Sequence, residues 1–197
     1  FLHAGSMLTC NLCLRRVTVL TPPTTVLPNG RVDVLGVSET HIRGTGMSDG
    51  KEGMWEGVPG GVVWTGMDEK YRGRSKEGCA IVMSERVWNG VTEYGWKGSR
   101  IVWVKGKVGL VKYAWVCVYA PVNVTSKKGL REREAFWEEV NACLKSLEKE
   151  RKLVMMGDMN AKVGDECVMD VVGKWGYLER MKMESGWWMS VLREGCS

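Results

Sequence analysis

Four polar residues that can bind a cation or a phosphate each stand at the end of a short apolar stretch of this sequence. They are Glu39, Tyr119, Asp158 and Asn160. If the apolar stretches are neighbouring strands, one edge of a sheet gathers two carboxylates, a phenol and a carboxamide. Oxygen ligands of this kind suit Mg²⁺ or Mn²⁺ rather than zinc, and Mg²⁺ held by one or two carboxylates usually binds a phosphate as well. The pattern therefore indicates a pocket where a hard cation could lie beside a phosphate.

Each of these residues also has an ordinary explanation. Acidic residues and asparagines often follow strands because turns begin there, and for Glu39 taken alone that explanation is the commoner one. The order of the motifs is more specific, since a carboxylate, a phenol, and then a carboxylate with a carboxamide follow three separate apolar stretches. The four residues are candidate site residues on condition that the fold brings them together.

The elements expected around these residues form one layered domain. Residues 1–30 carry a Pro-Asn-Gly turn signal and three prolines, so an irregular segment is expected there and order over residues 31–197. Phe136, Val140 and Leu144 recur at helical spacing and predict a helix over residues 130–150. Apolar, β-branched runs predict strands over residues 32–37, 62–65, 79–83, 101–104, 112–119 and 153–156. Several strands around one long helix indicate an α/β or α+β domain.

The connections between these elements give further predictions. Glycines predict a loop over residues 44–61, and Lys105-Gly106-Lys107 predicts a hairpin turn after the strand that begins at Ile101. Spaced apolar residues near the end of the chain indicate a last amphipathic helix. These residues are Met183, Trp187, Val191 and Leu192.

Composition and charge fit a globular protein. The 197 residues are 44% hydrophobic and 26% charged, which is ordinary for a folded domain rather than a disordered chain. No apolar run approaches the roughly 20 residues of a membrane span, so no membrane association is expected. The formal net charge of +5 permits a polyanionic partner without requiring one. Seven scattered cysteines form no regular framework, so the expected location is intracellular, nuclear or cytoplasmic, and not secreted.

Three weaker patterns have ordinary explanations that are at least as good. Cys10 and Cys13 form a CxxC pair with only His3 nearby, which is short of the four ligands of a zinc site. An acidic cluster at residues 165–170 is more simply a turn. A set of basic residues could flank a phosphate backbone or could equally be a solvated face. The set is Lys105, Lys107, Lys112, Lys127, Lys128, Arg131 and Arg133.

Three sequence motifs resemble, in order, those of the endonuclease/exonuclease/phosphatase superfamily. They are VLGVSETH at residues 34–41, VYAP at residues 118–121 and MGDMN at residues 156–160. The match continues at residues 78–81, 99–101, 133–137 and 173–176. The sequences of these motifs are most similar to those of the endonuclease-type domain of non-LTR retrotransposons and of proteins of the craniofacial development protein 2 type. The resemblance covers roughly residues 31–176.

This resemblance implies an α+β fold, a four-layer αββα sandwich of the DNase I type with the active site at one end of two packed sheets. It implies hydrolysis of a phosphodiester with Mg²⁺ or Mn²⁺, and in this branch the nicking of DNA. Glu39 would match the family's metal-binding glutamate, and Asp158 the aspartate that orients or activates the attacking water. Asn160 and Tyr119 would contact the scissile phosphate.

The chain also departs from the family's pattern. The family's first strand carries a metal-holding asparagine after Trp or Tyr, and neither Asn11 nor Asn29 has that setting. The family's C-terminal Asp-His pair has no counterpart, since the only histidines are His3 and His41, and His41 is more simply a loop residue. The fold is therefore expected to be incomplete, with an atypical first strand and without the C-terminal half of the sheets, and activity is expected to be impaired.

Whether the chain is an active enzyme is left open by these departures. A non-catalytic, nucleic-acid-binding remnant of the same fold is one alternative to a truncated DNA endonuclease. A phosphatase or phosphodiesterase that acts on a small or lipid substrate is the other. The sequence does not predict the DNA target or the oligomeric state.

Overall fold

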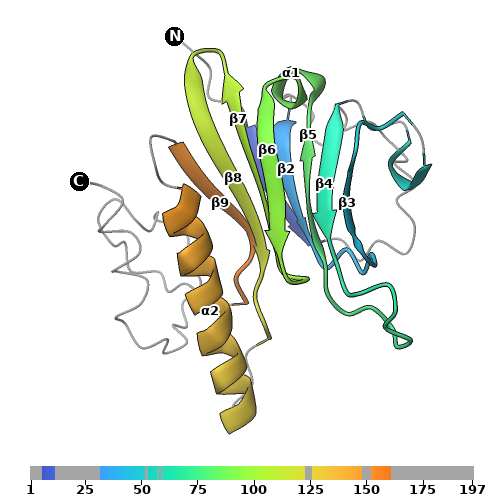
Figure 1. Ribbon diagram of the computed structural model, residues 1–197, viewed down its shortest axis with the longest axis vertical. Coiled ribbons are helices and arrows are strands. Elements are labelled where there is room, and N and C mark those ends of the chain that lie inside the picture. The colour runs from blue at the N-terminus through green and yellow to red at the C-terminus, as the bar shows by residue number, and fades with distance from the viewer. Residues whose placement is uncertain are drawn as a thin grey trace.

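Two β-sheets packed face to face form the body of the molecule (Figure 1). The structure, a computed structural model, describes residues 6–11, 32–51, 53–56, 58, 60–122, 126–147 and 152–160. One sheet has the strand order β1-β2-β5-β4-β3, and the other has the order β6-β7-β8-β9. The strands of the first sheet are β1 Ser6–Asn11, β2 Val32–Ser38, β3 Thr45–Ser48, β4 Gly61–Thr65 and β5 Cys79–Met83. Those of the second are β6 Val91–Lys97, β7 Ile101–Val108, β8 Val111–Tyr119 and β9 Lys152–Asp158.

The order of connections decides which strand ends lie together. Strands β6, β7 and β8 form an antiparallel meander, whereas β9 lies parallel to β8. Parallel neighbours need a crossover, and the helix α2 (Lys127–Leu147) supplies it. The described residues also contain two short helical turns, η2 (Gly53–Trp55) and α1 (Glu85–Trp88). Because β8 and β9 run the same way, both end at the same edge of the sheet.

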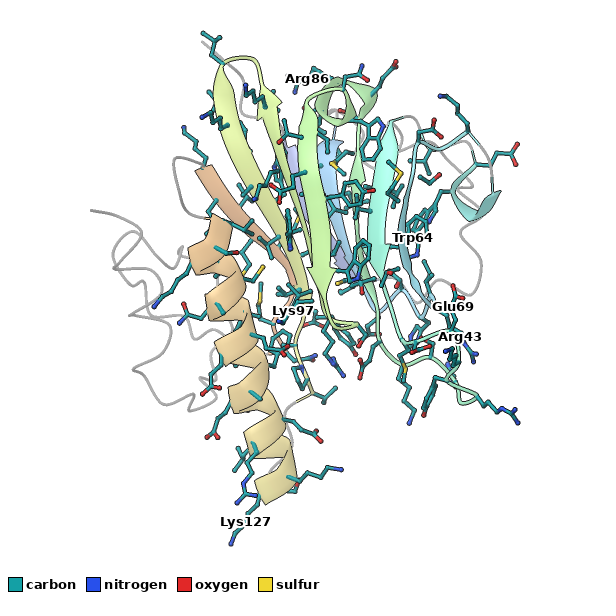
Figure 2. All side chains as sticks on the ribbon, in the orientation of Figure 1. Arg43, Trp64, Glu69, Arg86, Lys97 and Lys127 are labelled. Atoms are coloured by element: carbon teal, nitrogen blue, oxygen red, sulfur yellow. The ribbon has the colours of Figure 1, made fainter. Side chains whose placement is uncertain are left out.

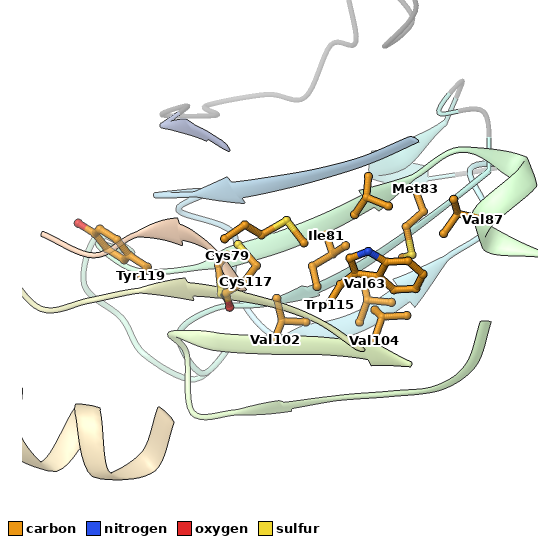
Figure 3. Close-up of a cluster of buried hydrophobic side chains, with 12 residues drawn as sticks. Val63, Cys79, Ile81, Met83, Val87, Val102, Val104, Trp115, Cys117 and Tyr119 are labelled. Carbon is orange, nitrogen blue, oxygen red and sulfur yellow. Dashed lines mark hydrogen bonds between the residues drawn. The ribbon is translucent and has the colours of Figure 1, made fainter. Parts of the chain in front are cut away.

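The space between the two sheets is filled by apolar side chains (Figure 3). Ile81 and Met83 of β5 face Val102 and Val104 of β7 and Trp115 of β8, and each of the five is at most 2% exposed. β-branched residues fit the pleated surface of a half-buried strand, which explains the dominance of valine and isoleucine here. This dry core fixes the two sheets against each other.

The helix α2 covers the outer face of the second sheet. Its apolar residues recur at helical spacing and are buried: Phe136, Val140, Leu144 and Leu147. They pack against the outward-facing residues of β7 and β8 and of the segment that follows β8: Ile101, Ala114, Val116, Val118 and Ala120. The predicted helix is thus confirmed, beginning three residues earlier than expected. No helix among the described residues is long and apolar enough to cross a membrane.

The predicted α+β sandwich is confirmed. Within the described residues the two sheets and α2 supply three of its four layers. The outer face of the first sheet carries its own apolar cluster, in which Trp55 and Val58 pack with Val37 and Val62. The predicted last helix and the acidic cluster of residues 165–170 lie outside the described residues.

The prediction that residues 1–30 are irregular is wrong for Ser6–Asn11, which form β1. This segment lacks the β-branched pattern on which strand prediction relies. It lies parallel to β2, with Met7 opposite Val34 and Cys10 opposite Val37. Pairing with a neighbouring strand outweighs weak local propensity, so the strand forms without a local signal. The other residues of that segment lie outside the described residues.

Two further expectations about connections are corrected by the structure. The hairpin turn predicted at Lys105–Lys107 is part of β7, where Lys107 pairs with Lys112, and the turn lies at Gly109 and Leu110. Gly109 has a φ of 61°, which glycine adopts without strain. The stretch predicted as a loop over residues 44–61 contains β3 and η2. Strand β6, a largely exposed edge strand, was not expected at all.

Candidate functional site

Three of the four candidate residues meet at one end of the packed sheets. Tyr119 and Asp158 are the last residues of β8 and β9 and are paired directly across these parallel strands. Glu39 follows the last residue of β2 in the other sheet. The Tyr119 hydroxyl donates a hydrogen bond to Glu39 Oε1 at 3.1 Å, which joins residues 80 positions apart. The site therefore bridges the two sheets.

The backbone around Glu39 is fixed in an uncommon conformation. Glu39 has a φ of 56°, in the left-handed region that few residues other than glycine adopt. The next residue, Thr40, donates its N–H to the Gly78 carbonyl at 3.1 Å. Gly78 has a φ of 131°, and a Cβ there would clash with the Thr40 hydroxyl. This close approach pins the loop to the start of β5 and holds the Glu39 side chain beside Tyr119.

The Tyr119 phenol is kept protonated by its surroundings. Burial raises the pKa of Tyr119 to about 12, and the hydrogen bond to Glu39 and the negative charges of Glu39 and Asp158 act in the same direction. The positive charge of Arg100 opposes the rise. At neutral pH the phenol is therefore a hydrogen-bond donor rather than a base.

Asn160 joins the ends of β8 and β9. Its backbone N–H donates to Asp158 Oδ1 at 2.8 Å, and its side-chain Nδ2 donates to the Ala120 carbonyl at 2.6 Å. Asn160 has a φ of 44°, and asparagine tolerates this left-handed region better than most residues. The Ala120 N–H donates in turn to the Asp158 carbonyl at 2.8 Å. The amide of Asn160 is thus held close to Tyr119 and Asp158.

Two charged residues beside the site were not identified as candidates from the sequence. Arg100 Nη1 donates to the Tyr119 carbonyl at 3.0 Å, and Arg100 Nη2 donates to Glu77 Oε1 at 2.8 Å. The guanidinium carbon lies 4.9 Å from the centre of the Tyr119 ring. Arg100 falls within the family match at residues 99–101, whereas the one signal for Glu77 is its position two residues before the buried strand β5.

Asn11 lies closer to the site than its sequence context suggested. It is the last residue of β1 and pairs with Ser38, which directly precedes Glu39. Because β1 and β2 are parallel, Asn11 stands at the same sheet edge as Glu39. Cys10 stands before Asn11 where the family has Trp or Tyr, but the strand register places Asn11 where a first-strand site residue would lie. The backbone makes Asn11 a further candidate for the site.

His41 lies in the loop after β2, as expected of a loop residue. Its Nδ1 lies 2.7 Å from the Ser75 carbonyl oxygen, so the ring is held by the segment that precedes β5. Its φ of 53° is again left-handed. The other histidine, His3, lies outside the described residues. Of the CxxC pair, Cys10 lies on β1 and Cys13 lies outside the described residues.

The donors at the site fit a hard cation. Glu39 and Asp158 offer carboxylate oxygens, and Asn160 offers a carboxamide. No group of three or more His, Cys, Asp or Glu side chains gathers among the described residues. A cation held here would therefore have few protein ligands and would keep waters, as Mg²⁺ commonly does, whereas a closed zinc site needs four protein ligands.

Sequence comparison finds relatives of the expected kind. The chain is 25% identical over 145 residues to craniofacial development protein 2 of Bos taurus, a match that covers 74% of this chain and 22% of that protein. It is 23% identical over 145 residues to the protein of the same name from Tragulus javanicus, covering 74% and 23%. The chain thus spans about a fifth of the length of these curated relatives. No protein-family profile matches it.

Comparison with solved structures supports the fold. The chain superposes on a 3′ phosphatase, NExo from Neisseria bound to a product DNA hairpin, with a TM-score of 0.51 and 16% identity. The match covers 82% of this chain and 60% of the other. The predicted resemblance is confirmed: the sequence relatives are craniofacial development protein 2 homologues, and the fold is the DNase I-like sandwich of the endonuclease/exonuclease/phosphatase type.

Proposed function

We propose that this chain carries a divalent-metal-dependent phosphodiester-hydrolysing site of the DNA endonuclease type. The observation that carries the proposal is the hydrogen bond from Tyr119 to Glu39, with Asp158 paired beside it, at one end of the two sheets. Residues at the ends of three strands of two sheets meet there, and Tyr119 alone of them also belongs to the apolar core between the sheets. Polar residues gathered in this way serve a ligand better than they serve packing.

Each residue takes a role that its contacts support. The Glu39 carboxylate would hold Mg²⁺ or Mn²⁺, and the cation would polarise the phosphoryl oxygens and stabilise the leaving oxygen. Asp158 orients the attacking water, since its place at the end of β9 is fixed by pairing with Tyr119. Asn160 would donate to the phosphate from its second amide N–H, the first being bound to the Ala120 carbonyl, and the protonated Tyr119 would donate to the phosphate in place of Glu39, where negative charge grows in the transition state.

We expect the rate to be low. A positioned general base contributes roughly 10²–10⁴-fold to a reaction of this kind. Among the described residues the one histidine, His41, is bound to the Ser75 carbonyl instead of to the Glu39–Tyr119 pair. A chain that binds DNA through this end and hydrolyses it slowly or not at all is the alternative that this observation favours.

The nicking of supercoiled plasmid tests the proposal. Wild-type protein should nick with Mg²⁺ and stop nicking with EDTA, and Glu39→Ala and Asp158→Asn should each lower the rate by about 10²-fold or more. Glu85→Ala removes an exposed carboxylate from α1 at the opposite end of the sheets and should nick like wild type.

The result also separates the alternatives. Unchanged nicking in both site variants would show that the chemistry lies elsewhere. Metal-independent DNA binding without nicking would favour the non-catalytic remnant. Release of phosphate from phosphoinositides in preference to DNA would favour a small-molecule or lipid substrate.

A further inference from the structure

Arg100 holds Tyr119 through its main chain and through its ring. The Tyr119 N–H donates to the Arg100 carbonyl at 2.9 Å, and Arg100 Nη1 donates back to the Tyr119 carbonyl at 3.0 Å. The guanidinium also lies over the ring, with its central carbon 4.9 Å from the ring centre. A cation over an aromatic face is attracted by the ring's electrons. Together these contacts fix both the position of the residue and the tilt of its ring.

Glu77 holds Arg100 in turn. Its Oε1 accepts from Arg100 Nη2 at 2.8 Å, and its Oε2 accepts from the Ser99 hydroxyl. Both charged side chains are about a quarter exposed, at 24% and 25%, so solvent screens the pair only in part. Glu77 precedes β5 in one sheet, and Ser99 and Arg100 precede β7 in the other. The ion pair therefore ties the sheets together next to the site.

We propose that Arg100, held by Glu77, is a positioning residue that directs the Tyr119 hydroxyl at Glu39. The inference rests on the proposed function and adds two residues to its machinery. Arg100 acts through Tyr119 and does not itself contact Glu39 in any hydrogen bond found among the described residues. Its task depends on the flat guanidinium fork, which reaches a carbonyl and a carboxylate while it stacks on a ring.

Lysine and arginine variants separate positioning from simple charge. Lysine keeps the positive charge but loses the planar fork. Arg100→Lys should therefore lower kcat by about tenfold while KM changes less than about twofold, because misplacing a catalytic group lowers the rate without weakening binding. A role in attracting DNA phosphate predicts the opposite: a raised KM in Arg100→Gln that Arg100→Lys restores.

A double-mutant cycle tests whether Arg100 acts through Tyr119. In the Tyr119→Phe background no hydroxyl remains to be aimed, so Arg100→Lys should lower kcat by less than about twofold further. If the two losses multiply in full, Arg100 works independently of the Tyr119 hydroxyl and the proposal is wrong. Glu77→Gln, which keeps the side-chain shape, should reproduce part of the loss and serves if Arg100→Lys does not fold.

A second readout does not depend on activity. In metal-free protein labelled at the tyrosine ζ-carbon, the Tyr119 signal at neutral pH reports the hydrogen bond of its hydroxyl, and Tyr119→Phe assigns it among the five tyrosines. The signal should shift in Arg100→Lys and in Glu77→Gln. Arg86→Lys is the matched control, because Arg86, a residue of α1, is likewise an arginine paired with a carboxylate, that of Asp33 at 2.5 Å. Figure 2 shows Arg86 at one end of the sheets and Lys97, which ends β6 close before Arg100, towards the other end.

The two readouts fail separately. A Tyr119 signal that stays in place in Arg100→Lys refutes the positioning role, whatever the nicking assay gives. A shifted signal in a protein that never nicks DNA with Mg²⁺ leaves the positioning intact and refutes the proposed function. Equal shifts in Arg86→Lys and Arg100→Lys would mean that the signal reports general loosening, which also refutes the proposal.

Discussion

The neighbours of Tyr119 decide what its hydroxyl can do. Burial and the carboxylate of Glu39 hold its pKa at about 12, so the proton stays on the phenol throughout the neutral range. The carboxylates of Glu39 and Asp158 would repel an incoming phosphate. The protonated phenol beside them supplies a hydrogen-bond donor at that place. The sequence pattern could propose that a phenol belongs to the site, but only the packing shows that it acts as a donor.

Tyr119→Phe tests this donor role. The substitution keeps the ring under Arg100 and removes only the hydroxyl that reaches Glu39. We expect Mg²⁺-dependent nicking to fall by roughly 10–10²-fold, because one aimed donor at developing charge is lost. The free energy of unfolding should fall by about 1.5–3 kcal/mol, the usual net worth of a hydrogen bond to a charged group. Single-turnover nicking and urea unfolding measure the two effects, and unchanged nicking would count against the role.

The thiol of Cys143 gives a pH test that is independent of the site. Burial raises its pKa from 9.0 to about 11, with Lys97 and Lys105 acting in the opposite direction. At pH 8 its alkylation should be roughly 10- to 100-fold slower in folded than in unfolded protein, because the thiolate is the reactive form. A thiol with a raised pKa stabilises the fold below pH 9, and that contribution is lost as the pH rises towards 11. Peptide mass spectrometry of alkylated protein gives the rates, and equal rates in the two states would contradict the burial.

At the scale of elements, local sequence patterns predicted the strands and the helix that are buried. They missed the strands that form through pairing with a neighbouring strand. Strand β8 carries a continuous apolar run because both of its faces are covered, and helix α2 carries a period of 3.6 because the sheet covers one of its faces. Strand β1 has no such pattern and exists through its pairing with β2. Strand β6 is an exposed edge strand, so little burial marks its sequence. The site residues at the ends of β2, β8 and β9 were predicted, and Asn11, the last residue of β1, was missed because β1 itself was not expected.

Gly157 shows how the end of strand β9 determines the position of a site residue. It precedes Asp158 in β9 with a φ of 119°, and a Cβ there would clash with the Val118 carbonyl oxygen of β8. Gly157→Ala should push β9 from β8, destabilise the fold by about 1–3 kcal/mol and displace Asp158, so that nicking is lost. Gly109→Ala is the matched control, since its φ of 61° is also left-handed but nothing lies within 4 Å of an added Cβ.

Urea unfolding and plasmid nicking distinguish the two glycines. The control should lose about 1 kcal/mol from its left-handed backbone and keep its activity. If Gly157→Ala and Gly109→Ala behave alike, the close approach of β9 to β8 is not what places Asp158.

At the scale of the whole molecule, the site exists because two sheets are packed. The hydrogen bond from Tyr119 to Glu39 and the ion pair of Arg100 with Glu77 both cross from one sheet to the other. Motif order predicted that Glu39 and Tyr119 belong together, through resemblance to a known family. The ion pair of Arg100 with Glu77 was not predicted, because the family match at residues 99–101 includes Arg100 alone and the contact joins segments 23 residues apart. Such contacts follow from the packed core rather than from local sequence.

Metal binding should therefore raise the stability of the entire fold. A cation that binds between Glu39 on one sheet and Asp158 on the other binds only when the sheets are packed, so it should stabilise the folded state. At a Mg²⁺ concentration ten times its Kd, the gain is roughly 1.4 kcal/mol and the Tm should rise by a few degrees. Calorimetry with Mg²⁺ against EDTA measures the change. The rise should vanish in Glu39→Ala and persist in Glu85→Ala, and a rise that survives in both variants would mean that Mg²⁺ binds away from the site.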